Sequence, residues 1–219
     1  MTEEQKKFKL GNAEYLAIVI VAVLALLTIY NIGKISTVSG NSVGVSLLPG
    51  VSASEIIPSG TPETYGGELN IKYDDVSPVN PQKADATISI MSNFDKTITL
   101  EGADLQRYIG IASRISCEYC CGAKSIIFDN GQPACGCAHS YAMRGLAKYL
   151  ITNHGSEYTD DEILTELAKW KVLFFPDIHK TKAAVLEQQG IEVNYINLAS
   201  NAYRGIEKGA SGGSMVGGC

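Results

Sequence analysis

Residues 117–139 read CEYCCGAKSIIFDNGQPACGCAH, and this segment holds five of the six cysteines in the 219-residue chain. A histidine follows the last of the five by two residues. Thiolates and imidazoles are ligands that zinc and other thiophilic metals prefer in proteins. The cluster therefore predicts a metal site, whose candidate ligands are Cys117, Cys120, Cys121, Cys135, Cys137 and His139.

The spacing within this segment predicts a treble-clef-like hairpin. The first two cysteines are separated by two residues, as in a zinc knuckle. Residues 125–128 and 132–134 are typical of short strands joined by the Asp-Asn-Gly turn at 129–131. This turn would fold the second group of cysteines back over the first. Because Cys120 and Cys121 are adjacent, we do not expect both side chains to face one ion.

Several chemistries fit such a cluster. Zinc with a spare thiol, copper(I) and an iron–sulfur cluster all use cysteine ligands, and the choice between zinc and copper stays open. A disulfide framework is an alternative, because six is an even number of cysteines, but such a framework has no use for His139. A thiol–disulfide oxidoreductase that uses Cys117 and Cys120 is a further alternative.

The last residue of the chain, Cys219, ends a glycine-rich tail over residues 205–219. A glycine-rich tail is flexible and can extend over a distance, but it forms no regular structure. If the tail folds back, it would supply a thiolate from Cys219 and a thioether from Met215, donors that suit copper. A dangling thiol and an intermolecular disulfide are the alternatives.

A long uncharged segment near the N-terminus predicts a membrane anchor. Residues 15–33 read YLAIVIVAVLALLTIYNIG, close to the roughly 20 apolar residues that span a bilayer. Lys6, Lys7 and Lys9 precede the segment, so the positive-inside rule places residues 1–14 in the cytoplasm and the later residues outside. A cleaved signal peptide is one alternative. A pilin-type leader cut after Gly11, on a subunit that assembles into filaments, is another.

The remaining chain predicts a stalk followed by an α+β domain that is mostly helical. Five of the seven prolines lie between Pro49 and Pro81, with glycine and serine around them. The predicted organisation is a cytoplasmic tail (1–14), a transmembrane helix (15–33), a stalk (34–80), a Cys/His-rich extracytoplasmic domain (81–204) and a flexible tail (205–219).

Periodicity and capping signals place the elements of this domain. Helices are predicted over residues 102–115, from near His139 to Gly155, from a Thr159–Glu162 capping box to Pro176, and over 180–189. Residues 82–93 fit a helix or a strand, and short strands are predicted at 68–75 and 191–198.

The charge balance excludes one class of partner. Eighteen Lys and Arg against 23 Asp and Glu give a net charge of −5, whereas nucleic-acid binding needs a basic face. The sequence holds no P-loop and no Cys-x-x-Cys-His haem motif. Whether the chain is an enzyme stays open at this stage.

Two segments resemble known families. PACGCAHSYAMRGLAKYL, which begins at Pro133, is similar to the Cys-Gly-Cys core of extracytoplasmic bacterial proteins named for a Pro-Cys-Tyr-Cys-Gly-Cys motif. The run from Cys117 through HGSEYTDDEILTELAKW resembles the helical thiol-reductase subunit of cytochrome c maturation. The whole chain is similar to uncharacterised single-pass membrane proteins of small-genome archaea. The first resemblance implies an extracytoplasmic location, and the second implies a Cys-x-x-Cys pair on a short helical bundle; neither implies an established activity.

Overall fold

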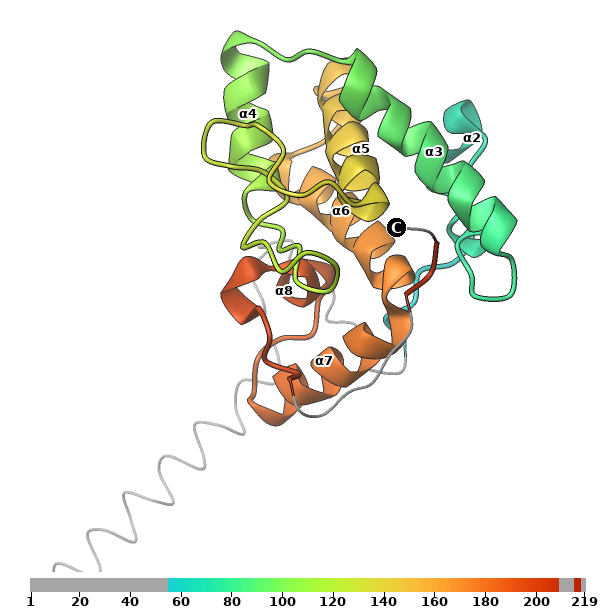
Figure 1. Ribbon diagram of the computed structural model, residues 1–219, viewed down its shortest axis with the longest axis vertical. Coiled ribbons are helices and arrows are strands. Elements are labelled where there is room, and N and C mark those ends of the chain that lie inside the picture. The colour runs from blue at the N-terminus through green and yellow to red at the C-terminus, as the bar shows by residue number, and fades with distance from the viewer. Residues whose placement is uncertain (1–54, 209–214, 218–219) are drawn as a thin grey trace, which may run out of the picture. The chain divides into compact units, whose positions relative to one another are not determined.

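The computed structural model describes residues 55–208 and 215–217, and all regular secondary structure in this part of the chain is helical (Figure 1). The elements are α2 (Gly66–Leu69), the 3-10 helix η1 (Tyr73–Asp75), α3 (Pro81–Thr97), α4 (Gly102–Ala112), α5 (Ala138–His154), α6 (Asp160–Phe174), α7 (Pro176–Gln188), α8 (Tyr195–Ala199) and the 3-10 helix η2 (Asn201–Tyr203). The α+β prediction is therefore wrong, because the described residues form helices and three isolated β-bridges but no strand.

Local signals explain where the helices begin. The Asn80 side chain accepts a hydrogen bond from the Lys83 amide, and Pro81 occupies the first turn of α3. Residues 82–93, which fit either state by pattern, are therefore helical. At α6, the Thr159 hydroxyl accepts from the Glu162 amide while the Glu162 carboxylate accepts from the Thr159 amide, which confirms the predicted capping box.

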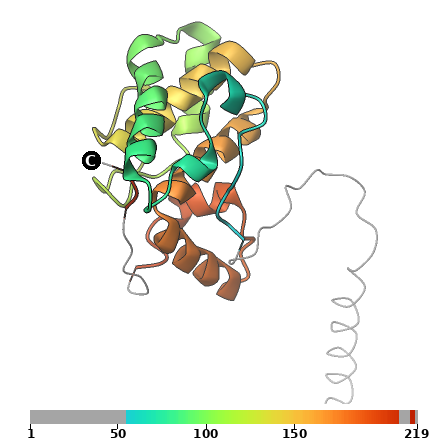
Figure 2. The ribbon, with the colours of Figure 1, turned by 90° about the vertical axis from the view of Figure 1, so that its right-hand side faces the viewer.

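Helix α5 lies at the centre of the fold, and α3 packs along one side of it (Figures 1 and 2). At Gly145 in α5, a Cβ would overlap the carbonyl oxygen of Met91 in α3. Glycine therefore permits the two backbones to approach. Helix α5 also packs on α4 and α6, and its buried residues lie on several sides of the helix. It is the helix that carries the last cysteine of the cluster as its N-cap.

The predicted strands are replaced by other structure. Residues 68–75 end α2 and form η1, while residues 191–198 run irregularly into α8. In the predicted hairpin, the Phe128 amide donates to the Gln132 carbonyl oxygen at 2.8 Å, so the turn is present. A second hydrogen bond, from the Ala134 amide to the Ile126 carbonyl oxygen at 3.1 Å, completes the isolated Ile127–Pro133 bridge, and the pairing extends no further into a strand. The treble-clef-like layout is reduced to a turn.

Residues 55–80 pack against the helical domain, so the predicted stalk is wrong over this range. Ile56, Tyr65 and Ile71 are almost completely buried, and the last two belong to the main hydrophobic core. Proline and glycine there shape a packed segment instead of a spacer. The fourth predicted helix also begins earlier, since Pro176 opens α7 at its first residue. In the predicted flexible tail, Glu207 and Val216 are buried.

Some predictions fall outside the described residues. They are the cytoplasmic tail (1–14), the transmembrane helix (15–33), the stalk up to residue 54, residues 209–214 of the tail, and Cys219. Within residues 55–208 and 215–217, no helix has both the length and the apolar character needed to cross a membrane.

The contact between α3 and α5 predicts the effect of a single methyl group. We expect Gly145→Ala to lower the free energy of unfolding by about 2 kcal/mol or more, because the new Cβ has only backbone to meet. Gly110→Ala, on α4 with open space at its Cβ position, should raise it by about 0.5–1 kcal/mol. Urea unfolding of both variants tests this, and equal effects would contradict the proposed packing constraint.

Candidate metal centre

Two segments of the chain carry the five clustered cysteines to one place. The first follows α4 and bends back on itself, because the Cys117 amide donates to the Ala123 carbonyl oxygen and Gly122 takes a φ of +69°. The second leads into α5, where the Cys137 sulfur is the N-cap and accepts from the Ser140 amide. The connection from α4 to α5 therefore brings its two ends together at the N-terminus of α5.

Four of the sulfurs form one group, made by Cys117, Cys121, Cys135 and Cys137, whose Sγ atoms all lie within 4.8 Å of one another. The Cys117 sulfur is 3.3 Å from that of Cys121, 3.2 Å from that of Cys135 and 3.9 Å from that of Cys137. Tetrahedral zinc with bonds of about 2.3 Å separates its sulfurs by about 3.8 Å. This group is therefore close to the size of a tetrathiolate metal site. We call it the four-cysteine site.

The same group also contains a covalent bond. Cys121 and Cys135 form a disulfide, with their Cα atoms 6.5 Å apart, while Cys117 and Cys137 are free thiols. A disulfide sulfur has no thiolate charge to give to a metal. The four-cysteine site and the disulfide are therefore alternative states of one arrangement of side chains.

A second group consists of Cys120, Cys137 and His139 and shares Cys137 with the first. The Cys120 sulfur lies 3.6 Å from His139 Nδ1. The structure thus brings together all six side chains that the sequence singles out. It also places Cys120 and Cys121 in different groups, as their adjacency predicts.

The C-terminal segment reaches this second group. Met215 Sδ lies 3.7 Å from the Cys120 sulfur, and the Val216 amide donates to the Phe174 carbonyl oxygen at 2.8 Å. Val216 is 2% exposed, so the segment is held at this point. The expectation that Met215 approaches the cluster agrees with this geometry, whereas Cys219 lies outside the described residues.

Hydrogen bonding and burial shift the pKa values of two of the thiols in opposite directions. The hydrogen bond to Cys137 and then burial raise the pKa of Cys117, while the bonds from Cys117 and from Cys120 lower the pKa of Cys137 despite its burial. These shifts favour a thiol at Cys117 and a thiolate at Cys137. The N-terminus of α5 also favours negative charge at Cys137.

A buried ion cluster anchors the first cysteine segment. The Glu118 carboxylate, 1% exposed, accepts from Lys171 at 3.2 Å and from Lys182 at 3.0 Å. Burial tends to raise the pKa of Glu118, but the two ammonium groups outweigh it and lower the value to about 2. Burial also lowers the pKa of Lys171 to about 8, against the opposing charge of Glu118. The residue between two cysteines is thus tied to α6 and α7.

A second buried cation anchors the other cysteine segment. Arg144, in α5, donates to the carbonyl oxygens of Cys135 at 2.8 Å and Ile126 at 3.2 Å. Its Nε atom pairs with Asp95 of α3 at 2.8 Å, where the two side chains are 0% and 4% exposed. Sequence reasoning missed both anchors, because isolated Glu, Lys and Arg residues carry no spacing signal.

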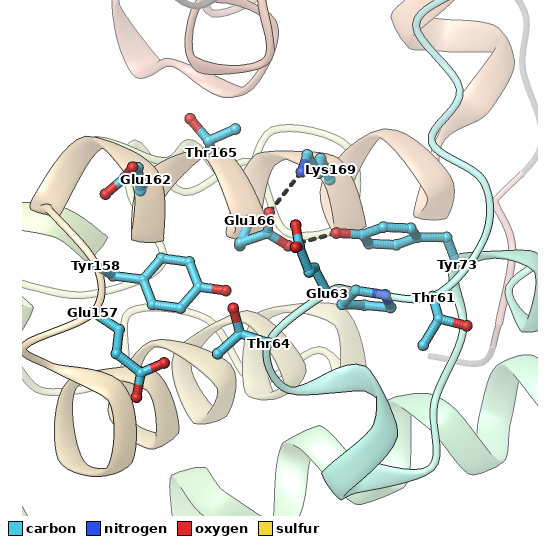
Figure 3. Close-up of a pocket in the computed structure, with 11 residues that line it drawn as sticks. Thr61, Glu63, Thr64, Tyr73, Glu157, Tyr158, Glu162, Thr165, Glu166 and Lys169 are labelled. Carbon is cyan, nitrogen blue, oxygen red and sulfur yellow. Dashed lines mark hydrogen bonds and ion pairs between the residues drawn. The ribbon is translucent and has the colours of Figure 1, made fainter.

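A pocket of about 420 Å³ lies against α6 and the segment before α2 (Figure 3). Its central carboxylate, Glu166, accepts hydrogen bonds from Tyr65 and Tyr73 and pairs with Lys169 at 2.6 Å. These contacts join residues 55–80 to α6, so Glu166 has a structural role in holding that segment. None of the six predicted ligands lines this pocket.

Comparisons of the chain with protein-family models, with curated proteins and with solved structures find no match.

The Glu118 cluster predicts how acid affects the domain. A pKa lowered from 4.5 to about 2 means that the carboxylate adds stability above pH 4.5, and that this stability is lost as the pH falls through that window. The loss amounts to about 3 kcal/mol. We expect Glu118→Gln to destabilise the domain by about 3 kcal/mol or more at pH 7, because two buried ammonium groups lose their counterion, and to flatten this acid dependence.

Urea unfolding between pH 7 and pH 2 measures both effects. Glu192→Gln, which changes an exposed carboxylate, is the matched control and should leave the profile unchanged. An unaltered acid profile in Glu118→Gln would show that this carboxylate does not carry the acid sensitivity.

Proposed function

We propose that this chain is a metal-binding protein whose four-cysteine site holds one zinc ion. The observation that carries the proposal is the distance of 3.2–3.9 Å from the Cys117 sulfur to the other three sulfurs of the site. Four thiolates with no oxygen ligand favour zinc over hard cations such as calcium or magnesium. Two of the four ligands, Cys117 and Cys135, are each 5% exposed, while Cys137 is half-buried and Cys121 is exposed.

The backbone around the site supports a structural role for the metal. Residues 113–137 connect α4 to α5 with isolated bridges as their only β-pairing. Connections of this length without regular structure are uncommon in compact domains. A metal that joins both ends of the connection would reduce the conformational freedom of the unfolded chain and add its binding energy to folding.

We further propose that the domain is displayed outside the cell membrane on a single N-terminal span. The support is the uncharged segment at residues 15–33 and the three lysines before it. Disulfides persist in oxidising compartments, so the bond between Cys121 and Cys135 is compatible with this location.

Metal binding can be tested on the reduced full-length chain in detergent. We expect one zinc per chain, and cobalt(II) in its place should give the intense thiolate-to-metal charge-transfer bands of a tetrathiolate. Cys117→Ser should weaken binding by about 100-fold or more, because it removes a buried ligand. Cys120→Ser, outside the four-cysteine site, is the control and should retain the tetrathiolate spectrum. No stoichiometric zinc in the reduced wild-type chain would reject the proposal.

Thiol–disulfide exchange is a second candidate function, favoured by the position of Cys117. Its sulfur lies within 3.3 Å of both sulfurs of the Cys121–Cys135 disulfide. Attack by the Cys117 sulfur on one of them, with the Cys117 proton passing to the neighbouring Cys137 thiolate, forms a new disulfide and releases the other sulfur as a thiolate. This pairing differs from the predicted use of Cys117 with Cys120. The predicted filament helix lies outside the described residues, so the pilin-like alternative gains no support from them.

Insulin reduction by dithiothreitol tests this second candidate. An oxidoreductase should accelerate the reaction, and Cys117→Ser should lower the rate about tenfold or more if Cys117 is the exchanging thiol. A wild-type rate equal to that of dithiothreitol alone would reject this function and leave metal binding unaffected.

A further inference from the structure

The disulfide leaves one set of soft donors intact. When Cys121 and Cys135 are bonded to each other, the four-cysteine site loses two ligands. The second group uses neither of these residues, because it consists of Cys120, Cys137 and His139, with Met215 beside it. We call these four residues the strap site, since the C-terminal segment closes it. The strap site is thus assembled in the oxidised chain.

The histidine in this group is held in one tautomer. His139 Nε2 lies 2.9 Å from the Val216 carbonyl oxygen, and a carbonyl can only accept a hydrogen bond. Nε2 therefore carries the proton, which leaves the lone pair on Nδ1 directed at the side of the ring where Cys120 lies. A metal-binding histidine is commonly oriented by such a contact from its other nitrogen. The contact comes from the same segment that supplies Met215.

The distances suit a four-coordinate metal. Bonds of about 2.3 Å to sulfur and about 2.0 Å to nitrogen at a tetrahedral angle separate a sulfur from a nitrogen by about 3.5 Å and two sulfurs by about 3.8 Å. The Cys120 sulfur and His139 Nδ1 are 3.6 Å apart, and the Cys120 and Met215 sulfurs are 3.7 Å apart. Small side-chain rotations would bring all the donors onto one ion.

The donor types identify the metal. Thiolate and thioether sulfurs together select copper(I), whereas the protein ligands of zinc are cysteine, histidine and carboxylates. We propose that Cys120, Cys137, His139 and Met215 form a copper(I) site that the C-terminal segment completes. Two thiolates, one neutral imidazole and one thioether together carry a charge of −2. The site with bound copper(I) therefore has a net charge of −1. The proposal deepens the metal-binding function, but it does not depend on zinc in the four-cysteine site.

The strap site has one side at the protein surface. Met215 is 44% exposed and Cys120 is half-buried, whereas His139 is 1% exposed. A thioether at the solvent edge is a weak ligand that an incoming thiolate can replace. The strap site is therefore suited to exchange copper(I) with another protein.

The experiment uses the full-length chain in detergent with the Cys121–Cys135 disulfide intact, as verified by alkylation and mass spectrometry. Copper(I) is added without oxygen as its acetonitrile complex, and bicinchoninate competes for the metal. We expect one copper(I) per chain. Met215→Leu should weaken binding about tenfold, and Cys120→Ser should weaken it about 100-fold. X-ray absorption should show one sulfur fewer around copper in Met215→Leu, an effect that a merely structural change would not produce.

Met143→Leu is the matched control for Met215→Leu, because Met143 belongs to the hydrophobic core and to neither cysteine group. It should keep copper(I) affinity in the oxidised chain. Unchanged copper(I) affinity in both Met215→Leu and Cys120→Ser would overturn the strap site and leave the zinc proposal intact. Normal copper binding without any zinc binding would instead reject the proposed function alone.

Discussion

The side chain of Arg144 is the contact on which the arrangement of the cysteines depends. Its guanidinium is completely buried and joins Asp95 of α3 to the carbonyl oxygens of Ile126 and Cys135. A buried charge is tolerated only when it is paired and hydrogen-bonded, so these partners are fixed relative to α5. The second cysteine segment is thereby held at the N-terminus of the helix that it precedes. Gly145, the next residue, lets α3 come close enough to supply Asp95.

The first cysteine segment is held in a comparable way by Glu118 between Lys171 and Lys182. Both segments thus meet because charged groups outside the cysteines fix their backbones. This placement lets one set of sulfurs serve two states. Reduction supplies four thiolates for the proposed zinc site, while oxidation consumes Cys121 and Cys135 and leaves the donors of the proposed copper(I) site available.

Local signals in the sequence predicted some of the helices. Thr159 with Glu162 begins α6 through contacts within a few residues, so pattern alone predicts this start, whereas the pattern of residues 82–93 did not distinguish a helix from a strand although Asn80 and Pro81 begin α3 in a similar way. The strands at 68–75 and 191–198 were wrong, because short apolar runs do not distinguish a strand from an irregular segment packed on helices. The prediction of a stalk was wrong over residues 55–80. The proline, glycine and serine content of this segment does not show that Tyr65 and Tyr73 bind Glu166, which is about a hundred residues away in the sequence.

The sequence by itself determined which side chains can bind metal, because five of the six cysteines and His139 are chemically distinctive and lie within 23 residues, 117–139. It also determined that Cys120 and Cys121 belong to different groups, since adjacent residues rarely face one ion. Only the tertiary structure decided how the donors divide into two overlapping sites, which cysteines are bonded, and that Met215 and the Val216 carbonyl join the second site. These features depend on contacts between residues far apart in the chain, and their geometry is set by the packing of α3, α5 and α6.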